Sequence, residues 1–364
     1  MRHALILAGG SGVRLWPMSR RARPKQLIPF IEGRSLIQLA MARLDGLIPT
    51  ERRYVCAGLE HRGAVLAALP DLSTERFLGE PVGRDTLNAA GFSAAVIARS
   101  DPEAVIAVFT ADHLIRPEEK FREIVAQGYE LVERSPATLV TFGIQPTFPS
   151  TGYGYLQLGE SLDETVRRVE VFREKPDAAT ARAYFDAGPA GYLWNSGMFV
   201  WQARTLLDCI RRYRPENYKG LSRIAEAWGS PDQESVVAEV YSSLEKISVD
   251  YAVMEPASRD SSVGVAAIPM NLDWMDVGSW PTFAQTCPAD DQGNALAAVR
   301  RILEETSDTL VASSDPGHLV AVMGCEGLVI VHTPDATLVC RKDQAEAVRY
   351  LQQKAAELFG RDYQ

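Results

Sequence analysis

The sequence lacks several features that would place it in a special class. No apolar run approaches the ~20 residues needed to cross a bilayer, and a short apolar run from Ala4 to Ala8 begins too early to leave room for a signal peptide. The five cysteines are odd in number, widely spaced and form no CxxC pair, and the five histidines show no ligand spacing. We therefore expect a cytoplasmic protein with reduced thiols, no structural zinc site and no membrane partner.

The sequence also has no excess of basic over acidic residues. Lysine and arginine number 38 against 47 acidic residues, which gives a net charge of −9. This balance argues against a nucleic-acid-binding protein. Basic residues gather only in the stretch RLWPMSRRARPK at 14–25, so an anionic small molecule is the ligand that the charge pattern favours.

Strand and helix patterns alternate through the first two thirds of the 364 residues. This alternation predicts an α/β fold with a doubly wound, Rossmann-like mixed sheet. Ligands of such sheets bind outside the carboxyl ends of the strands, so the turns after Ala8, Glu80, Thr110 and Gly143 should face one pocket. The expected strands are 4–8, 53–58, 75–80, 104–112 and 137–144, and the expected helices are 35–47, 61–69, 86–100 and 117–135.

The character of the sequence changes beyond about residue 285. Four short apolar runs (TLVAS, HLVAVMG, GLVIVHT and ATLVCRK) are separated by turn residues, and an amphipathic stretch at 343–359 closes the chain. Such short, regularly spaced runs predict a small β domain of stacked or solenoidal type with a terminal helix. We expect a catalytic domain at 1–284 and this β-rich domain at 285–364.

A glycine-rich turn follows the first strand in LILAGGSGVRLWP. Bare backbone N–H groups in such a turn bind phosphate, and Arg14 and Lys25 add positive charge. The dinucleotide fingerprint GxGxxG fails because position 15 is Leu15, and the P-loop fails because no Gly-Lys-Ser or Gly-Lys-Thr occurs. The turn therefore predicts a nucleotide-phosphate site that includes Leu7, Ala8, Gly9, Gly10, Ser11, Gly12 and Val13.

Ordered motifs run along most of the chain and resemble one known family. The sequence is similar to sugar-1-phosphate nucleotidylyltransferases, in the form carried by mannose-1-phosphate guanylyltransferases (GDP-mannose pyrophosphorylases). The LWPxSR portion at 15–20 separates that branch from the glucose-1-phosphate enzymes. The motifs that carry the resemblance are GGSGVRLWPMSRRARPKQL, GEPVGRDT, FTADHLI, FGIQPTFPSTGYGYL, FREKP, LWNSGMFVW, ISVDYAVME and DWMDVGSW.

The resemblance implies that the C-terminal β domain is similar to a left-handed β-helix. It also implies transfer of GMP from GTP to mannose 1-phosphate, which gives GDP-mannose and pyrophosphate. It implies Mg²⁺ held by Asp112 and Asp276, with Arg14 and Lys25 as further catalytic residues. Another hexose 1-phosphate (glucose 1-phosphate) or another nucleotide (ATP or UTP) is an alternative. A non-catalytic GDP-sugar sensor is a second alternative, and a nicotinamide dehydrogenase is a distant third, opposed by Leu15.

Selection of the base is predicted at the GEPVGRDT motif. Guanine presents two adjacent donors, N1–H and N2–H₂, and a carboxylate at Glu80 can accept both. Arg84 and Thr86 either orient Glu80 or touch the nucleotide, and Ala111 completes the nucleotide site. The family more often has GRNTAPA where this chain has GRDTLNAA, so Asp85, Leu87 and Asn88 depart from the pattern and leave the base preference open.

The sugar phosphate is predicted to bind the later motifs. Glu174 can accept hydrogen bonds from hydroxyls, Lys175 can pair with the phosphate as a compact cation, and Asn195 offers a donor and an acceptor. The aromatic neighbours Trp194, Phe199 and Trp201 are expected in the core. The other residues that we assign to this site are Gly143, Gly152, Tyr153, Gly197 and Asp273.

The β-rich tail carries no catalytic motif. Related enzymes use such a region for subunit contacts, so we expect a homodimer. Longer relatives add a cupin-type isomerase domain, for which a chain ending at Gln364 has no room, so we expect a single activity.

Overall fold

The computed structural model describes residues 1–10, 12–29, 31 and 33–363. Contacts divide the chain into two compact units. Unit 1 comprises 1–9, 40–111 and 115–274, and unit 2 comprises 10–39, 112–114 and 275–364. The boundary between residues 284 and 285 stays a prediction about domain organisation along the chain.

Unit 1 is built on a nine-stranded mixed sheet of order β3-β2-β1-β4-β9-β6-β10-β8-β7. The first four strands of that order are parallel, β9 is antiparallel to both of its neighbours, and β10 is again parallel to β6. The predicted mixed α/β sheet is therefore confirmed. The strands are β1 (Arg2–Leu7), β2 (Arg53–Gly58), β3 (Phe77–Glu80), β4 (Val105–Thr110), β6 (Thr138–Ile144), β7 (Tyr155–Ser161), β8 (Arg167–Arg173), β9 (Tyr192–Gln202) and β10 (Gly264–Pro269).

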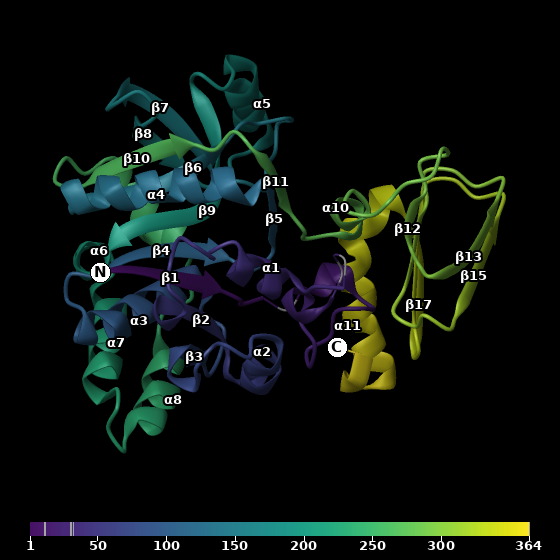
Figure 1. Cartoon of the computed structure of the whole chain (residues 1–364), viewed down its shortest axis with the longest axis horizontal. Coiled ribbons are helices and arrows are strands. Elements are labelled where there is room, and N and C mark those ends of the chain that lie inside the picture. The colour runs from purple at the N-terminus through teal and green to yellow at the C-terminus, as the bar shows by residue number, and fades with distance from the viewer. Residues whose placement is uncertain (11, 30, 32, 364) are drawn as a thin grey trace. The chain divides into compact units, whose positions relative to one another are not determined.

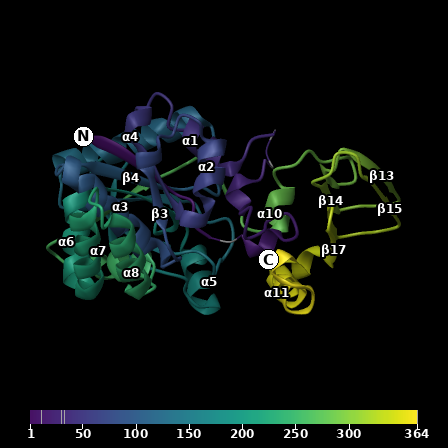
Figure 2. The same cartoon turned by 90° about the horizontal axis from the view of Figure 1, so that it is seen from below.

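Helices cover both faces of this sheet (Figures 1 and 2). On one face, Phe121 of α4 packs against Phe109 of β4. On the other, Ile106 and Val108 of the same strand join the core formed with Phe92 of α3. Alternate side chains of a strand thus enter two apolar layers, as doubly wound sheets require. The helices of unit 1 are α2 (Arg62–Ala68), α3 (Asp85–Ser100), α4 (Glu118–Arg134), α5 (Ala178–Ala187), α6 (Ala203–Tyr213), α7 (Pro215–Ala227), α8 (Gln233–Ser243), the π-helical turn η6 (Asp250–Met254) and α9 (Glu255–Ser258).

The helix expected at 35–47 is shorter than predicted. It forms as α1 (Leu36–Ala42), and turns follow it. Gly46 adopts a φ of +81°, a conformation that does not continue a right-handed helix. None of the helices over the described ranges is both long and apolar enough to span a membrane.

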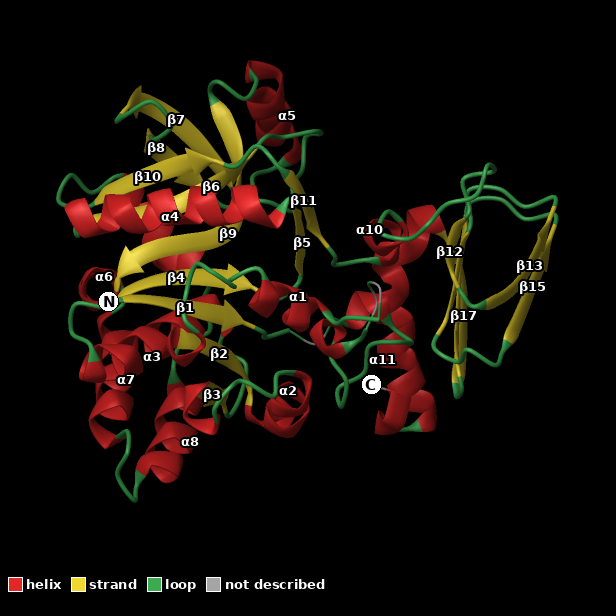
Figure 3. Ribbon diagram, in the orientation of Figure 1, coloured by secondary structure: helices red, strands yellow, loops and turns green. Residues whose placement is uncertain are grey.

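Unit 2 contains the predicted short strands, drawn in yellow in Figure 3. One sheet pairs β12 (Ala295–Ala297), β14 (Leu310–Ser313), β16 (Leu328–Thr333) and β17 (Ala336–Arg341), and a second pairs β13 (Arg300–Glu304) with β15 (Leu319–Met323). All pairings except β16 with β17 are parallel, as in stacked turns of a β-helix. The terminal helix starts as a 3₁₀ turn over Lys342–Ala347 and continues as α11 (Val348–Phe359).

The N-terminal LWPxSR segment is part of the core of unit 2. Leu15 and Trp16 are buried with Trp280 and with strand residues of the β-rich region. The Trp16 indole N–H donates to the Tyr363 carbonyl at 2.8 Å. Trp280, on α10 (Trp280–Ala284), donates its indole N–H to the Trp16 carbonyl at 2.9 Å. This segment therefore anchors the loop that follows β1 to the C-terminal region.

Arg20 adds further contacts between the LWPxSR segment and the C-terminal region. Its Nη2 lies 2.9 Å from Asp335 Oδ1, and its guanidinium lies over the rings of Trp16 and Tyr363. Only 14% of the Arg20 side chain is exposed, so this ion pair is less screened than a surface pair.

We predict that Arg20→Met lowers the free energy of unfolding by about 1–2 kcal/mol, because it removes a partly buried ion pair and two cation–π contacts. Urea unfolding followed by tryptophan fluorescence measures the change. Arg21→Met, at an exposed neighbouring position, is the matched control and should change it by less than ~0.5 kcal/mol. Equal effects of the two substitutions would contradict the anchoring role.

Candidate functional site

The turn after β1 depends on glycine at two positions. Gly10 and Gly12 have φ values of +98° and +61°, which residues with a Cβ rarely adopt. A Cβ on Gly12 would also lie 2.8 Å from Lys25 Cβ. Gly12 therefore allows the stem of Lys25 to pass close to the turn. Ser11, which was predicted to bind phosphate, lies outside the described residues.

Lys25 is the most buried cation of this region, with 7% of the residue exposed. Its ammonium lies 2.9 Å from Asp112 Oδ2 and 4.0 Å from Asp276 Oδ1. It also donates a hydrogen bond to the Val277 carbonyl at 3.2 Å. A buried ammonium requires such partners because burial of an unpaired charge is costly. Lys25 therefore neutralises part of the charge of two carboxylates from distant segments.

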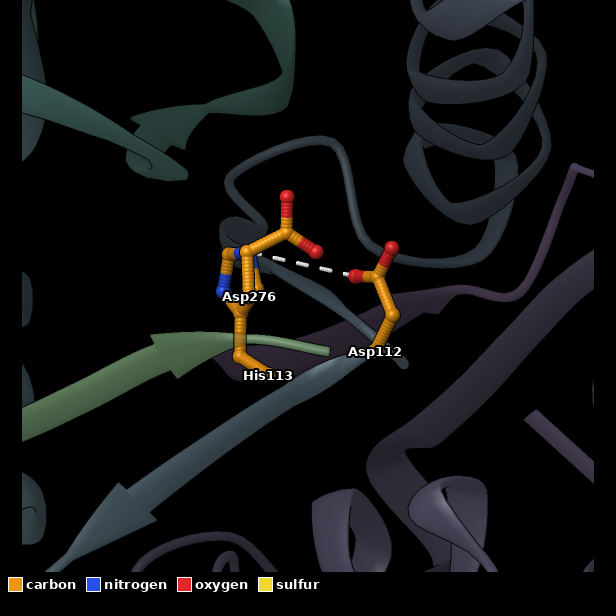
Figure 4. A group of neighbouring side chains, drawn as sticks. All are labelled: Asp112, His113 and Asp276. Atoms are coloured by element: carbon orange, nitrogen blue, oxygen red, sulfur yellow. Dashed lines mark ion pairs between the residues drawn. The ribbon is translucent and has the colours of Figure 1, made fainter. Parts of the chain in front are cut away.

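The two carboxylates and one imidazole form a candidate metal centre. Figure 4 shows the Asp112 and Asp276 carboxylates directed toward common space, with His113 beside them. One ligand atom from each of the three residues lies within 4.8 Å of the others. The Val277 N–H donates to the Asp112 carbonyl at 3.0 Å, which holds the two segments together. Carboxylate oxygens are the ligands that hard divalent cations prefer.

The surroundings of one Asp276 oxygen indicate that the centre fits a cation. Its Oδ1 is buried and accepts no hydrogen bond from the residues that the structure describes. Burial of its carboxyl, followed by the nearby charge of Asp112, raises the pKa of Asp276. An ionised oxygen in this position needs a positive partner closer than the Lys25 ammonium at 4.0 Å. Asp112 and Asp276 would hold a divalent cation here, and His113 is near enough to add a ligand.

Arg14 also reaches this cluster. A Cβ on Gly278 would lie 2.9 Å from Arg14 Nη2 and 3.3 Å from Asp276 Oδ1, so the glycine leaves room for the guanidinium beside the acid. Arg14 Nη1 lies 3.2 Å from Glu346 Oε2, and both side chains are substantially exposed. All four residues predicted to be catalytic, Arg14, Lys25, Asp112 and Asp276, are thus gathered within unit 2. Their catalytic roles stay predictions.

We predict that Lys25→Met has opposite effects on metal binding and turnover. Loss of the ammonium removes a competitor for the carboxylates, so the protein should bind Mn²⁺ roughly tenfold more tightly, a difference of ~1.4 kcal/mol. Turnover should fall about 10²-fold, because a preorganised charge is lost. Calorimetric titration with Mn²⁺ and a pyrophosphate-release assay measure the two quantities.

Lys120→Met, on the exposed side of α4, is the matched control and should leave both quantities unchanged. Weaker metal binding by Lys25→Met, or turnover near that of the control, would contradict the role of Lys25 as a counter-ion to the acidic pair.

In unit 1, Glu80 ends β3 and is 5% exposed. Its Oε1 accepts a hydrogen bond of 2.6 Å from the Tyr241 hydroxyl, and the Arg84 backbone N–H also donates to its carboxyl. Burial raises the pKa of Glu80, and these two hydrogen bonds oppose that rise. A Cβ on Gly9 would lie 3.7 Å from Glu80 Oε2, so this oxygen faces the start of the glycine turn.

The rest of the GRDTLNAA segment is engaged within the protein. The Arg84 guanidinium donates to the Ser242 carbonyl, and the Thr86 hydroxyl accepts from the Val249 N–H at 3.0 Å. Leu87 and Asn88 are fully buried. Asn88 donates to the Arg84 and Glu245 carbonyls, each at 2.8 Å. The departures at 87 and 88 therefore serve packing against the segment after α8. The roles of Arg84 and Thr86 toward Glu80 or the nucleotide stay predictions.

The remaining predicted nucleotide residues are backbone positions at the end of the central strands. The Ala111 N–H donates to the Leu7 carbonyl at 3.0 Å, and the Ala8 N–H donates to the Cys56 carbonyl at 2.8 Å. Val13 begins a 3₁₀ turn in unit 2. The parallel strands β1, β3 and β4 thus bring three of the four predicted turns, those after Ala8, Glu80 and Thr110, to one edge of the sheet of unit 1.

Glu174 and Lys175 follow β8. Glu174 is 8% exposed, and its Oε1 lies 3.2 Å from the Lys175 ammonium. A Cβ on Gly154 would lie 2.5 Å from Glu174 Oε2, so the glycine of the GYGY turn makes room for this carboxylate. Lys175 has a φ of +41°, a backbone conformation that costs a residue with a Cβ roughly 1–3 kcal/mol and is concentrated at functional sites.

Asn195 of β9 is held at both ends of its amide. Its Oδ1 accepts from the Thr141 hydroxyl at 2.7 Å, and its Nδ2 donates to Asp250 Oδ1 at 2.9 Å. Gly143, on the neighbouring strand β6, is required for packing, since a Cβ there would lie 2.4 Å from Leu193 Cδ1. The predicted core aromatics Trp194, Phe199 and Trp201 are all buried, as expected.

The other predicted sugar residues differ in their surroundings. Tyr153 packs between the rings of Trp194 and Trp274, at centroid distances of 5.0 and 5.5 Å. Gly152 donates its N–H to the Ser150 hydroxyl, and Gly197 has a φ of +70°. Asp273 is exposed at the start of β11 (Asp273–Asp276). Contact of these residues with a sugar stays a prediction.

Sequence reasoning missed three polar residues that support these groups. Tyr241 holds Glu80, Asp250 holds Asn195, and Glu255 Oε1 accepts from the Glu174 N–H at 2.9 Å. Asp250 and Glu255 stand in the quoted motif ISVDYAVME, which was the available signal. Tyr241 stands outside every motif.

Comparison with known proteins identifies the family. The family model described as nucleotidyl transferase matches residues 3–293. The chain belongs to the nucleotidyl transferase family. A second model, described as the MannoseP isomerase/GMP-like beta-helix domain, matches residues 300–354, which include β13 to β17. The predicted family and the predicted two-part fold class are both confirmed.

Relatives of this nucleotidyl transferase match it over nearly its whole length. Mannose-1-phosphate guanylyltransferase of Klebsiella pneumoniae is 35% identical over 98% of this chain and 75% of its own. The enzyme of the same name from Escherichia coli is 36% identical over 95% of this chain and 72% of its own. The crystal structure of mannose-1-phosphate geranyltransferase from Thermus thermophilus has a TM-score of 0.84 and 32% identity, and the match covers 97% of this chain and 98% of that one.

Proposed function

We propose that the protein transfers GMP from GTP to mannose 1-phosphate, which yields GDP-mannose and pyrophosphate. The observation that carries the proposal is the cluster of Lys25, Asp112 and Asp276 in a member of the nucleotidyl transferase family. Two relatives that share about 35% identity with the chain are named for this activity. Selectivity for guanine and for mannose is supported mainly by the names of these relatives.

The reaction needs charge stabilisation more than proton transfer. A phosphate oxygen of the sugar attacks the α-phosphorus in line, and pyrophosphate leaves from the opposite side. The attacking phosphate monoester is already ionised at neutral pH, so no general base is required. Catalysis of such transfers depends on positioning and on neutralising negative charge. The buried ammonium of Lys25 and the guanidinium of Arg14 supply positive groups beside the acidic pair.

We propose Mg²⁺ as the cation held by Asp112 and Asp276. When bound, it would act as a Lewis acid on phosphate oxygens. The protein's own contribution is to hold the carboxylates at fixed positions, through the Val277 N–H on the Asp112 carbonyl. Asp112 and Asp276 would divide their charge between this cation and Lys25, whose ammonium would pair with the triphosphate.

Selectivity rests on unit 1. Glu80 would accept from guanine N1–H and N2–H₂ through the carboxylate that Tyr241 and the Arg84 backbone orient. Glu174 and Asn195 would receive sugar hydroxyls, and Lys175 would bind the sugar phosphate. A non-catalytic GDP-sugar sensor has no need of the acidic pair and its counter-ion, which favours the enzyme.

A substrate panel tests the proposal. GTP, ATP and UTP are each assayed with mannose 1-phosphate and with glucose 1-phosphate for pyrophosphate release, with and without Mg²⁺. We expect GTP with mannose 1-phosphate and Mg²⁺ to exceed the other pairs by about 10²-fold in kcat/KM, as a hydrogen-bonding site discriminates. Glu80→Gln should lower this ratio for GTP over ATP by about tenfold, since one guanine donor loses its acceptor.

A higher kcat/KM with another pair of nucleotide and sugar phosphate would show that the protein is a different hexose-1-phosphate nucleotidylyltransferase. An absence of pyrophosphate release with every pair would support the sensor. An unchanged GTP preference in Glu80→Gln would contradict base reading by Glu80 alone.

We further propose that β13 and β15 form the contact surface of a homodimer. Ile302, Leu319 and Met323 on these strands are half or more exposed. Arg300, Ile302 and Glu304 all lie on exposed positions of β13. A twofold axis at Ile302 would place Arg300 of one copy opposite Glu304 of the other, so the surface is complementary to itself.

We predict that Met323→Glu shifts the protein toward monomers in light scattering coupled to size-exclusion chromatography, because it places a charge in an apolar contact. Leu162→Glu, at an exposed turn of unit 1, is the matched control. A wild-type protein that is monomeric at micromolar concentration, or a Met323→Glu dimer as stable as that of the control, would contradict the proposed surface.

A further inference from the structure

A partly buried acidic network includes several of the residues assigned to the sugar phosphate. Asp250, the first residue of η6, accepts from Asn195 Nδ2 at 2.9 Å. The opposite end of the same amide accepts from the Thr141 hydroxyl at 2.7 Å. Thr141 also donates to the Met198 carbonyl. The orientation of Asn195 is therefore determined by a hydroxyl on one side and a carboxyl on the other.

Asp250 shares its surroundings with a second acid and only one base among the described residues. Glu174 is 8% exposed and lies 3.2 Å from the Lys175 ammonium. Burial, and then the charge of Glu174, raises the pKa of Asp250 to about 7, while Lys175 and Asn195 oppose the rise. Burial also raises the pKa of Glu174. Two carboxyls and one ammonium thus share one region in which the second negative charge is costly.

The other groups around this network, within the part of the chain that the structure describes, do not supply a second cation. Glu255 of α9 and Asp85 of α3 add negative charge that acts on Glu174, and Tyr251 acts on Lys175. Helix α6 also packs against η6. Its buried residues are Ala203, Leu206, Cys209 and Ile210, and burial raises the pKa of the Cys209 thiol to about 12, so α6 places no buried charge here. Lys175 is therefore the cation that balances the negative charge of the two carboxyls.

We propose that Asp250 is a positioning residue that takes up one proton from solvent when the sugar phosphate binds. The inference rests on the proposed function, because it takes Lys175 as the phosphate ligand. A dianionic phosphate at Lys175 draws the ammonium away from Glu174 and adds negative charge beside both carboxyls. Protonation of Asp250 relieves this repulsion.

The hydrogen bond to Asn195 survives this change of state. A protonated carboxyl keeps one carbonyl oxygen as an acceptor, so Asn195 Nδ2 retains its partner and the amide keeps its orientation. The network thus adjusts its charge to the substrate without moving the residue that faces the sugar. Binding of the sugar phosphate should weaken at high pH, because the proton that accompanies it is then scarce.

The dependence of KM on pH tests this inference. KM for mannose 1-phosphate is measured from about pH 6.5 to about pH 9 at saturating GTP and Mg²⁺. A phosphate monoester has its second pKa near 6, so the substrate is dianionic over most of this range. We expect the wild-type KM to rise by up to about tenfold per pH unit once the pH exceeds the pKa of Asp250, while KM for GTP changes little.

Asp250→Asn keeps an acceptor for Asn195 and mimics the protonated acid. This variant should show a KM for mannose 1-phosphate that no longer rises with pH and a kcat within a few-fold of wild type. Asp186→Asn, an exposed acid on α5, is the control and should keep the wild-type slope. A flat wild-type profile, or a wild-type slope retained by Asp250→Asn, would overturn the proposal.

If Asp250→Asn does not fold, a second measurement on the wild-type protein still tests the inference. Calorimetric binding of mannose 1-phosphate to the wild-type protein at about pH 7.5, in buffers of different ionisation enthalpy, counts the protons exchanged. Net uptake approaching one proton supports the inference, and zero uptake or net release overturns it. Failure of the proposed function is distinct, because mannose 1-phosphate would then neither bind nor support the release of pyrophosphate from GTP at any pH.

Discussion

The buried ammonium of Lys25 is the constraint on which the acidic pair of unit 2 depends. Two aspartates from segments more than 150 residues apart come within reach of one another, and their repulsion must be balanced. Lys25 does this at 2.9 Å from one carboxylate and 4.0 Å from the other. Because the longer distance leaves Asp276 Oδ1 without a hydrogen bond from the described residues, the balance is incomplete, and this is why we propose a further cation at the centre.

Residues along the whole N-terminal motif have structural roles in unit 2, and this accounts for the length of the motif. Gly12 gives Lys25 space, Leu15 and Trp16 enter the core of unit 2, and Arg20 pairs with Asp335. Trp16 and Arg20, which follow the predicted phosphate-binding turn, are thus fixed to the C-terminal region of unit 2. The LWPxSR portion therefore contributes to the position of Lys25 through packing, without contacting the carboxylates itself.

Much of this organisation could be predicted from the sequence. Hydrophobic periodicity indicated the alternating strands and helices, and the resemblance of FTADHLI and DWMDVGSW to motifs of the family indicated Asp112 and Asp276. The ends of α1 could not be predicted, because Gly46 acts through a backbone angle that periodicity does not report. Leu87 and Asn88 looked like departures at the base site, yet they are buried against residues some 150 positions later.

Partners of functional residues were the hardest to predict. Tyr241 and Asp250 become meaningful only when α8 and η6 pack beside β3 and β9, since neither residue is near its partner in sequence. A single segment, 241–255, supports Glu80 through Tyr241, Asn195 through Asp250 and Glu174 through Glu255. The groups of unit 1 that are predicted to read the base and to bind the sugar therefore share one supporting segment.

The central claim is that Asp112 and Asp276 together hold a divalent cation that Lys25 alone does not replace. Anomalous diffraction from crystals grown with Mn²⁺ and GTP tests it most directly. The account predicts one strong anomalous peak in direct contact with carboxylate oxygens of both aspartates. A strong peak that contacts neither aspartate, with the Lys25 ammonium still between the two carboxylates, would contradict it.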